Sequence, residues 1–407
     1  MPHEHDHGEI HDREAAVEMV RDLRAAMLPE QSTTTVSLTD SFEGMALAED
    51  IVAERDVPEH SHSTMDGFAF DATDDYPLTL VDAEVFPEDD PPSIASGEAV
   101  RVATGAPIPP EANAVLKIEE ATVTEGELDG IPLDPGTYVY ERGSNVSAGE
   151  TLFEAGEVLS PKDAILLRDL GRESVTVREP FDVGLLATGT EIHEGRSSDL
   201  DSPMLAALFR SWGHTATIEG TVPDEYDRVE DAIASVASEC DVVVTTGGTS
   251  VGKKDHVIRA LRSLGEVVFH RVSVRPGKPL AAARLPDHDA VAFAVPGKPV
   301  GAHTITTLVA RPFFTGEASL PTVSATATRG VDVPTEGFDY AIPVTLADGE
   351  ATPLGATGSA LSVYDDTFDP SVLSSSTRAT RADGFVYTTT GFAAKESVRV
   401  VPYPTVE

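Results

Sequence analysis

Lysine is scarce in this chain, and most of it lies in one stretch of glycine-bearing loops. The 407 residues contain seven lysines, four of them between residues 253 and 298. Loops that combine backbone N–H groups with cations bind phosphate and other oxyanions. The pattern therefore predicts an anion site, the alternative being a few solvated surface lysines. The residues concerned are Gly247, Gly248, Gly252, Lys253, Lys254, Arg271, Arg275, Pro276, Gly277, Lys278, Pro279, Pro296, Gly297, Lys298 and Pro299.

The rest of the composition repels anions. Acidic residues outnumber basic ones by 69 to 29, which gives a formal charge of −40. This balance argues against nucleic acid and anionic membranes as partners, because both carry dense negative charge. It fits a proteome adapted to high salt, such as that of a halophilic archaeon, where a Debye length of about 3 Å at 1 M screens the repulsion. An anionic substrate must therefore be captured by local positive groups.

Length and hydrophobicity indicate a multidomain globular protein. Length alone predicts about two to four domains with sizeable cores. Hydrophobic residues make up 41% of the chain, and no apolar run approaches the ~20 residues of a membrane span. We expect a cytoplasmic protein, because no signal-peptide pattern opens the chain. The single cysteine, Cys240, excludes an internal disulfide.

The pattern of apolar residues divides the chain into several regions. A histidine-rich tail at residues 1–12 is either a disordered terminus or a metal-binding one. A helix should follow at about residues 12–28, and a capping pattern that begins at Ser160 predicts a second helix. The predicted domains are an N-terminal helix and linker domain at 13–52 and 150–180, a β-rich domain at 53–149, an α/β domain at 181–318 and a C-terminal β domain at 319–407.

The α/β domain should hold the anion site. Apolar strands, at residues 183–187, 241–245 and 291–295, alternate with helices after Phe181. That alternation is typical of a parallel sheet, which binds ligands at the carboxyl ends of its strands. We therefore expect the loops after these strands to line one crevice. The predicted fold class is multidomain α/β plus β, with a small barrel-like domain at the C-terminus.

The loop after the second strand has the densest chemistry. Residues 241–256 are Asp-Val-Val-Val-Thr-Thr-Gly-Gly-Thr-Ser-Val-Gly-Lys-Lys-Asp-His. The glycines let the backbone approach a ligand, and the N-terminus of the following helix favours negative charge. Ser250 can donate to an oxyanion, and Asp255 is either the helix N-cap or a ligand of a metal or substrate. The spacing from glycine to lysine excludes a Walker A loop.

Five motifs, in order along the chain, resemble one family. This loop resembles the S-G-G-x-S-x-G-x-x-D loop of the molybdopterin molybdenumtransferases, which include the C-terminal domain of gephyrin. Four other stretches resemble the family's S-x-M-D-G-Y-A, T-G-A-P-[IV]-P, T-G-[DST]-E-[IL] and K-P-G-K-P motifs. They are Ser63-Thr64-Met65-Asp66-Gly67-Phe68-Ala69, Thr104-Gly105-Ala106-Pro107-Ile108-Pro109, Thr188-Gly189-Thr190-Glu191-Ile192 and Arg275-Pro276-Gly277-Lys278-Pro279.

The resemblance implies an activity and an assembly. It implies an elongated homodimer of four-subdomain chains that inserts molybdate, or tungstate, into adenylated molybdopterin and releases AMP and metal-charged cofactor. The molybdopterin adenylyltransferase is a further implied partner. Molybdate and a pyrophosphate repel each other, so cations and backbone N–H groups must hold both. A bridging Mg²⁺ or another divalent cation would offset more charge.

The resemblance also implies roles by position. Ser250, Asp255, Arg275 and Lys278 would hold pterin, phosphate or molybdate, with Glu191 in the same cleft. Asp66 and Thr104 would reach that cleft from the β-rich domain of the other subunit. The implied catalytic residues are Asp66, Thr104, Glu191, Asp255 and Lys278, and the implied metal ligands are Asp66, Glu191 and Asp255.

Three stretches depart from the family pattern. Asn145 stands where G-E-D-[IV]-x-x-G has a carboxylate. In place of P-G-N-P-V-S, the chain has Lys298 for the amide and Gly301 for the hydroxyl. The D-S-N segment is Asp201-Ser202-Pro203. Lys298 either strengthens oxyanion binding or occupies the space of the pterin.

Two main hypotheses follow for the function. The first is an active molybdenum or tungsten insertase, which the retained Asp66, Glu191, Asp255 and Lys278 favour. The second, which Asn145 and Gly301 favour, is a non-catalytic paralogue that binds cofactor or precursor as a carrier or assembly scaffold. A different anhydride-cleaving pterin or nucleotide enzyme on the same fold is a third alternative.

Overall fold

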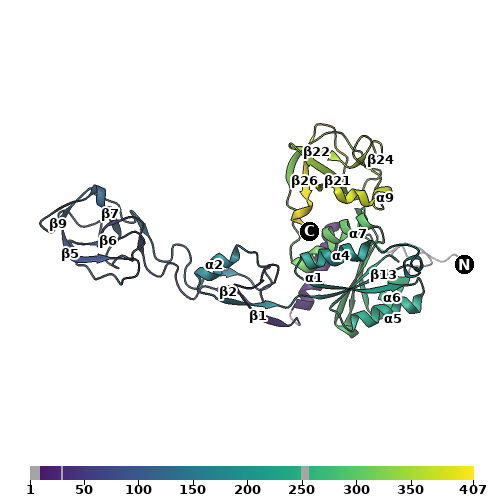
Figure 1. Cartoon of the computed structure of the whole chain (residues 1–407), viewed down its shortest axis with the longest axis horizontal. Coiled ribbons are helices and arrows are strands. Elements are labelled where there is room, and N and C mark those ends of the chain that lie inside the picture. Colours follow the sequence, from purple (N-terminus) through teal and green to yellow (C-terminus); the bar gives the residue numbers. More distant parts are fainter. Residues whose placement is uncertain (1–9, 29–30, 249–255) are drawn as a thin grey trace. The chain divides into compact units, whose positions relative to one another are not determined.

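A computed structural model describes residues 10–28, 31–248 and 256–407 (Figure 1). Its internal contacts divide the chain into two compact units. Unit 1 comprises residues 1–34, 43–46 and 177–407, and unit 2 comprises residues 35–42 and 47–176. None of the helices in the described ranges has the length and apolarity that a membrane crossing requires.

Unit 2 is built on a six-stranded sheet with a core on each face. Strand β4 lies between β6 and β7 and is antiparallel to both. Alternate residues point to opposite faces, so Ala69 and Val100 pack in one cluster while Phe68 and Phe70 pack in the other. In sheet order the strands are β7 (Ala114–Lys117), β4 (Gly67–Phe70), β6 (Glu98–Val102), β5 (Leu78–Val85), β9 (Glu127–Asp129) and β8 (Thr122–Thr124).

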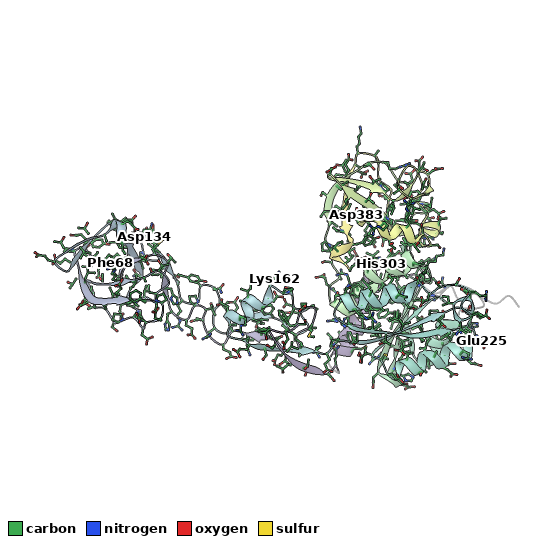
Figure 2. The ribbon with its side chains drawn as sticks, viewed as in Figure 1. Phe68, Asp134, Lys162, Glu225, His303 and Asp383 are labelled. Carbon is green, nitrogen blue, oxygen red and sulfur yellow. The ribbon has the colours of Figure 1, made fainter. Side chains whose placement is uncertain are left out.

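Shorter pairings complete unit 2. The predicted second helix is present as α2 (Asp163–Asp169), and Lys162 at its start is labelled in Figure 2. The Asp163 carboxylate accepts hydrogen bonds from the N–H and hydroxyl of Ser160, both at 2.7 Å, so the acidic half of the predicted capping box forms. The helix itself begins later than predicted, with Lys162 as its N-cap and no side-chain cap bond. The pairs are β2 (Ile51–Val52) with β11 (Thr151–Phe153), and β3 (His62–Ser63) with β10 (Val139–Tyr140); β1 (Thr33–Ser37) pairs with β12 (Ser174–Arg178) where the chain passes between the two units.

The sheet at the centre of unit 1 is mixed, so the prediction of a parallel sheet is right for only part of it. Four strands are parallel, and the last two run antiparallel to their neighbours. The reason is local: β18 and β19 are joined by the short turn η3 (Pro286–His288), and a parallel crossover needs a dozen or more residues. In sheet order the strands are β14 (Thr215–Val222), β13 (Asp182–Thr188), β15 (Val242–Thr246), β19 (Ala290–Val295), β18 (Ala281–Leu285) and β16 (Glu266–His270).

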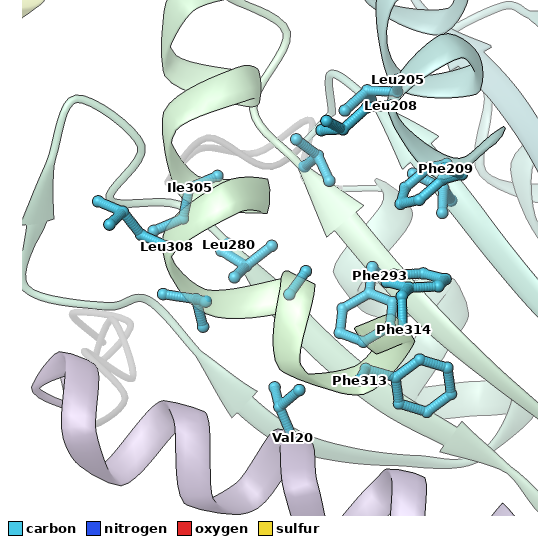
Figure 3. Packing of buried hydrophobic residues seen from close by; sticks show 14 of the residues in the cluster. Val20, Leu205, Leu208, Phe209, Leu280, Phe293, Ile305, Leu308, Phe313 and Phe314 are labelled. Carbon is cyan, nitrogen blue, oxygen red and sulfur yellow. The ribbon is translucent and has the colours of Figure 1, made fainter. Parts of the chain in front are cut away.

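Helices cover both faces of this sheet (Figure 1). On one face α5 (Tyr226–Ala237) and α6 (His256–Leu264) bury apolar side chains against β15 and β19. The other face carries α1 (Arg13–Met27), α4 (Asp201–Ser211) and a continuous helical stretch made of α7 (Pro299–Ile305), the π-helical η4 (Thr306–Ala310) and α8 (Arg311–Thr315). Figure 3 shows Phe293, Phe313 and Phe314 packed together near Val20 of α1.

The end of the chain forms a small barrel, as the sequence predicted. Strands β21, β22, β20, β26 and β25 pair in that order, and β25 also pairs with β21, which closes the ring. We call these five strands the C-terminal barrel. His303 of α7, labelled in Figure 2, lies 2.8 Å from a Glu407 carboxylate oxygen and fastens the chain end to the α/β part. The strands are β20 (Val323–Ala327), β21 (Asp339–Ala347), β22 (Glu350–Pro353), β25 (Gly384–Thr388) and β26 (Ser397–Pro402).

Candidate functional site

A cavity of about 320 Å³ in unit 1 gathers positive charge. Three of its lining side chains are the cations Arg275, Lys278 and Lys298, and we call it the cationic pocket. None of the ion pairs within the described ranges involves any of these three. Their charges are therefore available to a ligand, in a chain of formal charge −40. The other lining residues are Pro276, Gly277, Pro279, Pro296, Gly301, Pro370, Ser371 and Ser374.

The antiparallel strand β18 explains why two lysine loops meet here. Ala281 at the start of β18 pairs with Ala294 near the end of β19. The loop before β18, with Arg275 and Lys278, therefore lies at the same edge of the sheet as the loop after β19. In a parallel pair these loops would lie at opposite edges.

The C-terminal barrel holds the loop in place. Strand β17 (Val274–Arg275) pairs in parallel with β21, and the Asp339 N–H donates to the Ser273 carbonyl at 2.7 Å. The guanidinium carbon of Arg275 lies 4.0 Å from the ring centre of Phe338, and Lys278 Nζ lies 5.4 Å from the same centre. Burial lowers the pKa of Lys278, and repulsion from Arg275 and Arg271 lowers it further.

Lys298 is fastened across the pocket. Its Nζ donates to the Ser371 carbonyl, 2.9 Å away, at the short helix α9 (Pro370–Leu373). The Ser374 hydroxyl donates to the same carbonyl at 3.0 Å, and the Val300 N–H donates to the Ser374 carbonyl at 3.1 Å. Helix α9 and the loop after β19, which carries Lys298, are thus joined by hydrogen bonds into one wall of the pocket.

Glycines let the loops at the strand ends touch backbone to backbone. The Gly247 N–H donates to the Val295 carbonyl at 3.0 Å. A Cβ at Gly247 would lie 2.7 Å from the Thr188 carbonyl oxygen, and one at Gly297 would lie 3.0 Å from Gly247 Cα. Larger residues would push these loops apart, so the glycines keep the edge compact. Pro299 begins α7 directly after Lys298.

Glu191 lies on the short helix α3 (Thr190–His193) after β13 and is exposed. Its carboxylate folds back over Gly189, where a Cβ would lie 3.2 Å from Glu191 Oε1. A φ of 145° at Gly189 also favours glycine there. Asp224 supports the loop, because its N–H donates to the Thr190 hydroxyl at 3.1 Å; no motif in the sequence marks this residue.

Asp66 and Thr104 meet within unit 2. Asp66 Oδ1 accepts the Thr104 N–H at 2.7 Å and the Thr104 hydroxyl at 2.9 Å, and these bonds lower the pKa of Asp66. Two motifs that are distant in sequence therefore form one exposed polar pair. The adjoining Gly67 is fixed by close packing, since a Cβ there would lie 2.1 Å from the Leu116 carbonyl oxygen.

Part of the predicted site lies outside the described residues: Ser250, Gly252, Lys253, Lys254 and Asp255. Of the predicted metal ligands, Asp66 belongs to unit 2 and Glu191 to unit 1. In the part of the chain that the structure describes, no three His, Cys, Asp or Glu side chains gather as they would around a metal ion.

Comparisons with known proteins agree with this architecture. Family models named MoeA N-terminal region (domain I and II) and probable molybdopterin binding domain match residues 12–171 and 184–316. A molybdopterin molybdenumtransferase of Synechococcus elongatus is 32% identical over 274 residues, which are 62% of this chain and 68% of that protein. The chain belongs to the molybdopterin molybdenumtransferase family.

Other members agree. A molybdopterin molybdenumtransferase of Haemophilus influenzae is 34% identical over 272 residues, which cover 63% of this chain and 66% of that protein. The crystal structure of the molybdopterin biosynthesis protein MoeA from Pyrococcus horikosii matches with a TM-score of 0.70 and 26% identity, and covers 97% of this chain and 99% of that one. Membership makes the chain a transferase of molybdenum cofactor biosynthesis, which favours the enzyme hypothesis over a non-catalytic carrier.

Two departures from the pattern of the molybdenumtransferases have local explanations. Asn145 Nδ2 donates to Asp169 Oδ2 of α2 at 3.0 Å, whereas a carboxylate at position 145 would repel Asp169. At Gly301 a Cβ would lie 3.6 Å from Ser374 Cβ, which is an ordinary contact, so the lost hydroxyl leaves space beside the cationic pocket.

Asp201, at the start of α4, is the buried carboxyl nearest the glycine loops. It is 7% exposed, its Oδ1 has no hydrogen-bond partner among the described residues, and its Oδ2 lies 4.0 Å from the position of a Cβ on Gly297. Burial, and then repulsion from Asp199, raise the pKa of Asp201 to about 6. The carboxyl therefore keeps its proton in the folded protein under conditions that ionise it in the unfolded chain.

We predict that Asp201→Asn stabilises the protein at neutral pH but not below pH 4. Because the folded-state pKa is raised, wild-type stability is greatest below the unfolded pKa and falls as pH rises through about 6. The variant should lose this dependence and gain at most about 3 kcal/mol near pH 7. Denaturant titrations across this range measure the gain, with exposed Asp287→Asn as the control. An equal effect at both ends of the range would contradict the assignment.

Proposed function

We propose that the chain inserts molybdate, or tungstate, into adenylated molybdopterin and releases AMP and the metal-charged cofactor. The cationic pocket carries the proposal, because Arg275, Lys278 and Lys298 converge there with no carboxylate partner in the described ranges. A tetrahedral dianion matches this charge. Membership of the molybdenumtransferase family supplies the class of reaction.

Each group of residues has a task in this reaction. The guanidinium of Arg275 and the ammonium groups of Lys278 and Lys298 donate hydrogen bonds to the oxyanion, each worth roughly 1.5–3 kcal/mol. The glycine loops at Gly247 and Gly297 bring backbone close to the bound substrate. The phosphoanhydride of the adenylated substrate breaks when an oxygen nucleophile, from water or molybdate, bonds to one of its phosphorus atoms and AMP leaves. Nearby cations stabilise the negative charge that develops on the phosphates.

A divalent cation, with Mg²⁺ as the first candidate, fits the donor chemistry of the carboxylates. Both hydrogen bonds from Thr104 end on Asp66 Oδ1. Within the described part of the chain, Asp66 Oδ2 therefore remains open to a metal ion. Glu191 is exposed and offers oxygen atoms of the kind that Mg²⁺ prefers. We assign Asp66, Glu191 and Asp255 as its ligands, and the ion would neutralise part of the charge between substrate phosphates and protein.

We also propose the assembly, the compartment and the partner enzyme with which the reaction takes place. We infer a homodimer in which Asp66 and Thr104 of one subunit act with Lys278 of the other. The acidic surplus of 69 over 29 supports operation in the cytoplasm of a halophilic archaeon. The adenylated substrate would come from a molybdopterin adenylyltransferase, which we propose as a partner.

The direct test is AMP release from adenylated molybdopterin with molybdate and Mg²⁺ at high salt. We expect wild-type turnover, and for Lys278→Ala a loss of roughly tenfold or more in molybdate affinity, because a charged hydrogen bond is removed. Lys395→Ala, which removes an exposed lysine of the C-terminal barrel region, is the matched control. Absence of AMP release by the wild type would reject the proposed function, and unchanged affinity would remove Lys278 from the site.

Subunit exchange tests the shared active site. Assayed at a molybdate concentration well below the weakened Kd of Lys278→Ala, Asp66→Ala and Lys278→Ala should each show little activity, but mixing them in equal amounts should restore about one quarter of wild-type activity. Half of the dimers are then hybrids, and each hybrid keeps one intact site. Mixing Asp66→Ala with Thr104→Val should restore no activity. One subunit supplies both residues to a given site, so every site in a hybrid dimer lacks one of them. Equal recovery in both mixtures, or a monomer in light scattering, would count against the dimer.

Lys298→Asn tests the chain's own departure from the family pattern. The bond from Nζ to the Ser371 carbonyl supports a role in oxyanion binding, so we expect roughly tenfold weaker molybdate binding at low salt. The loss should shrink as salt rises, because screening weakens the lost attraction. Calorimetric titration with molybdate at two KCl concentrations measures the loss of affinity and its dependence on salt, with Lys395→Asn as the control. Faster AMP release by Lys298→Asn would show instead that the ammonium occupies pterin space.

A further inference from the structure

Two like-charged side chains share one aromatic ring beside the cationic pocket. The guanidinium carbon of Arg275 lies 4.0 Å from the Phe338 ring centre, and the ammonium of Lys278 lies 5.4 Å from it. Both distances fall within the ~6 Å over which a cation is attracted to a ring face. Phe338 is half-buried and is not among the residues that line the pocket. It therefore stands behind the cations and does not compete with a ligand.

The two cations need such support because they repel each other. Lys278 is repelled by the positive charges of Arg275 and Arg271. Within the described ranges, no ion pair neutralises Arg275 or Lys278. Asp339, which directly follows Phe338, accepts a hydrogen bond from the Tyr387 hydroxyl at 2.7 Å and pairs with neither cation among the described ion pairs. A carboxylate in the place of the ring would hold the cations equally well, but it would cancel the charge that attracts the anion.

The backbone fixes the ring against the loop. Phe338 directly precedes β21, whose first residues pair with β17: Val274 pairs with Asp339 and Arg275 with Tyr340. The loop is closed by the bond from the Val272 N–H to the Lys278 carbonyl at 2.9 Å. Phe338 also packs against the apolar core of the C-terminal barrel. The barrel thus fixes the position of the Phe338 ring, and the ring in turn fixes the positions of Arg275 and Lys278.

We infer that Phe338 is a positioning residue for the oxyanion. Its ring holds Arg275 and Lys278 side by side and leaves their charge and their N–H donors free for a tetrahedral dianion. The C-terminal barrel is therefore required for anion affinity, through a residue that does not touch the anion. This inference rests on the proposed function for the identity of the dianion.

The test measures binding of molybdate alone by calorimetric titration. Phe338→Leu should weaken binding by roughly three- to tenfold, because a cation–π contact of about 1 kcal/mol is lost for at least one cation. Phe338→Tyr keeps a ring of the same size and should bind within about twofold of wild type. Phe392→Leu removes an aromatic side chain from the same barrel core, away from the pocket, and should leave binding unchanged.

Kinetics separates positioning from simple packing. In Phe338→Leu the KM for molybdate should rise while kcat at saturating molybdate stays unchanged. If Phe338 only packs the core, the unfolding midpoint will fall with no change in molybdate affinity, which overturns the inference. Equal losses in Phe338→Tyr and Phe338→Leu would overturn it too. Phe338→Met preserves apolar area and replaces Phe338→Leu if the latter does not fold.

The outcomes also distinguish this inference from the proposed function. A wild type that binds molybdate in a Phe338-dependent way but releases no AMP keeps the inference and rejects the proposed reaction. A wild type that releases AMP while Phe338→Leu binds molybdate normally rejects the inference alone. A wild type with no affinity for molybdate rejects both the inference and the assignment of the pocket.

Discussion

Cations that bind a dianion must lie close together without being neutralised by their own protein, and the oxyanion site that we propose in unit 1 depends on this constraint. With 69 acidic residues in the chain, a carboxylate partner for each cation would be easy to find. The described structure gives these cations other neighbours: an aromatic ring beside Arg275 and Lys278, and a backbone carbonyl that accepts a hydrogen bond from Lys298. A carbonyl dipole or a ring face stabilises a cation and leaves its net charge in place, whereas a carboxylate would cancel it.

The topology of unit 1 follows from the need to bring these residues to one place. The antiparallel strand β18 turns its amino end toward the carboxyl end of β19, so two lysine loops meet at one edge. The pairing of β17 with β21 then brings the C-terminal barrel against the same loop. Both connections also bury apolar residues in the clusters on the two faces of the sheet, such as Ala282 and Ala283 of β18 and Ala341 of β21. Both are needed for the cationic pocket.

The sequence predicted the parts of this arrangement that depend on local patterns. Apolar runs marked β13, β15 and β19, and the clustering of lysine in glycine loops marked Lys278 and Lys298 as partners in one region. Strand direction was not predictable for β18, because its short run of three alanines followed by arginine and leucine looks the same in either direction. Phe338 was not predictable either. A half-buried phenylalanine before a strand carries no sign of the cations it contacts, and only the pairing of β17 with β21 brings them together.

High salt, which we propose as the working condition of this chain, favours a pocket that is enclosed between a sheet edge and a barrel. High ionic strength screens the repulsion within an acidic chain, but it also screens the attraction between exposed cations and an anion. Partly buried charges are screened much less. Lys278 is half-buried, which lowers its pKa, and Lys298 is fixed to the wall by its hydrogen bond to the Ser371 carbonyl. An acid-rich chain that must capture an anion in salt thus gains more from a few enclosed cations than from many exposed ones, and the C-terminal barrel provides that enclosure.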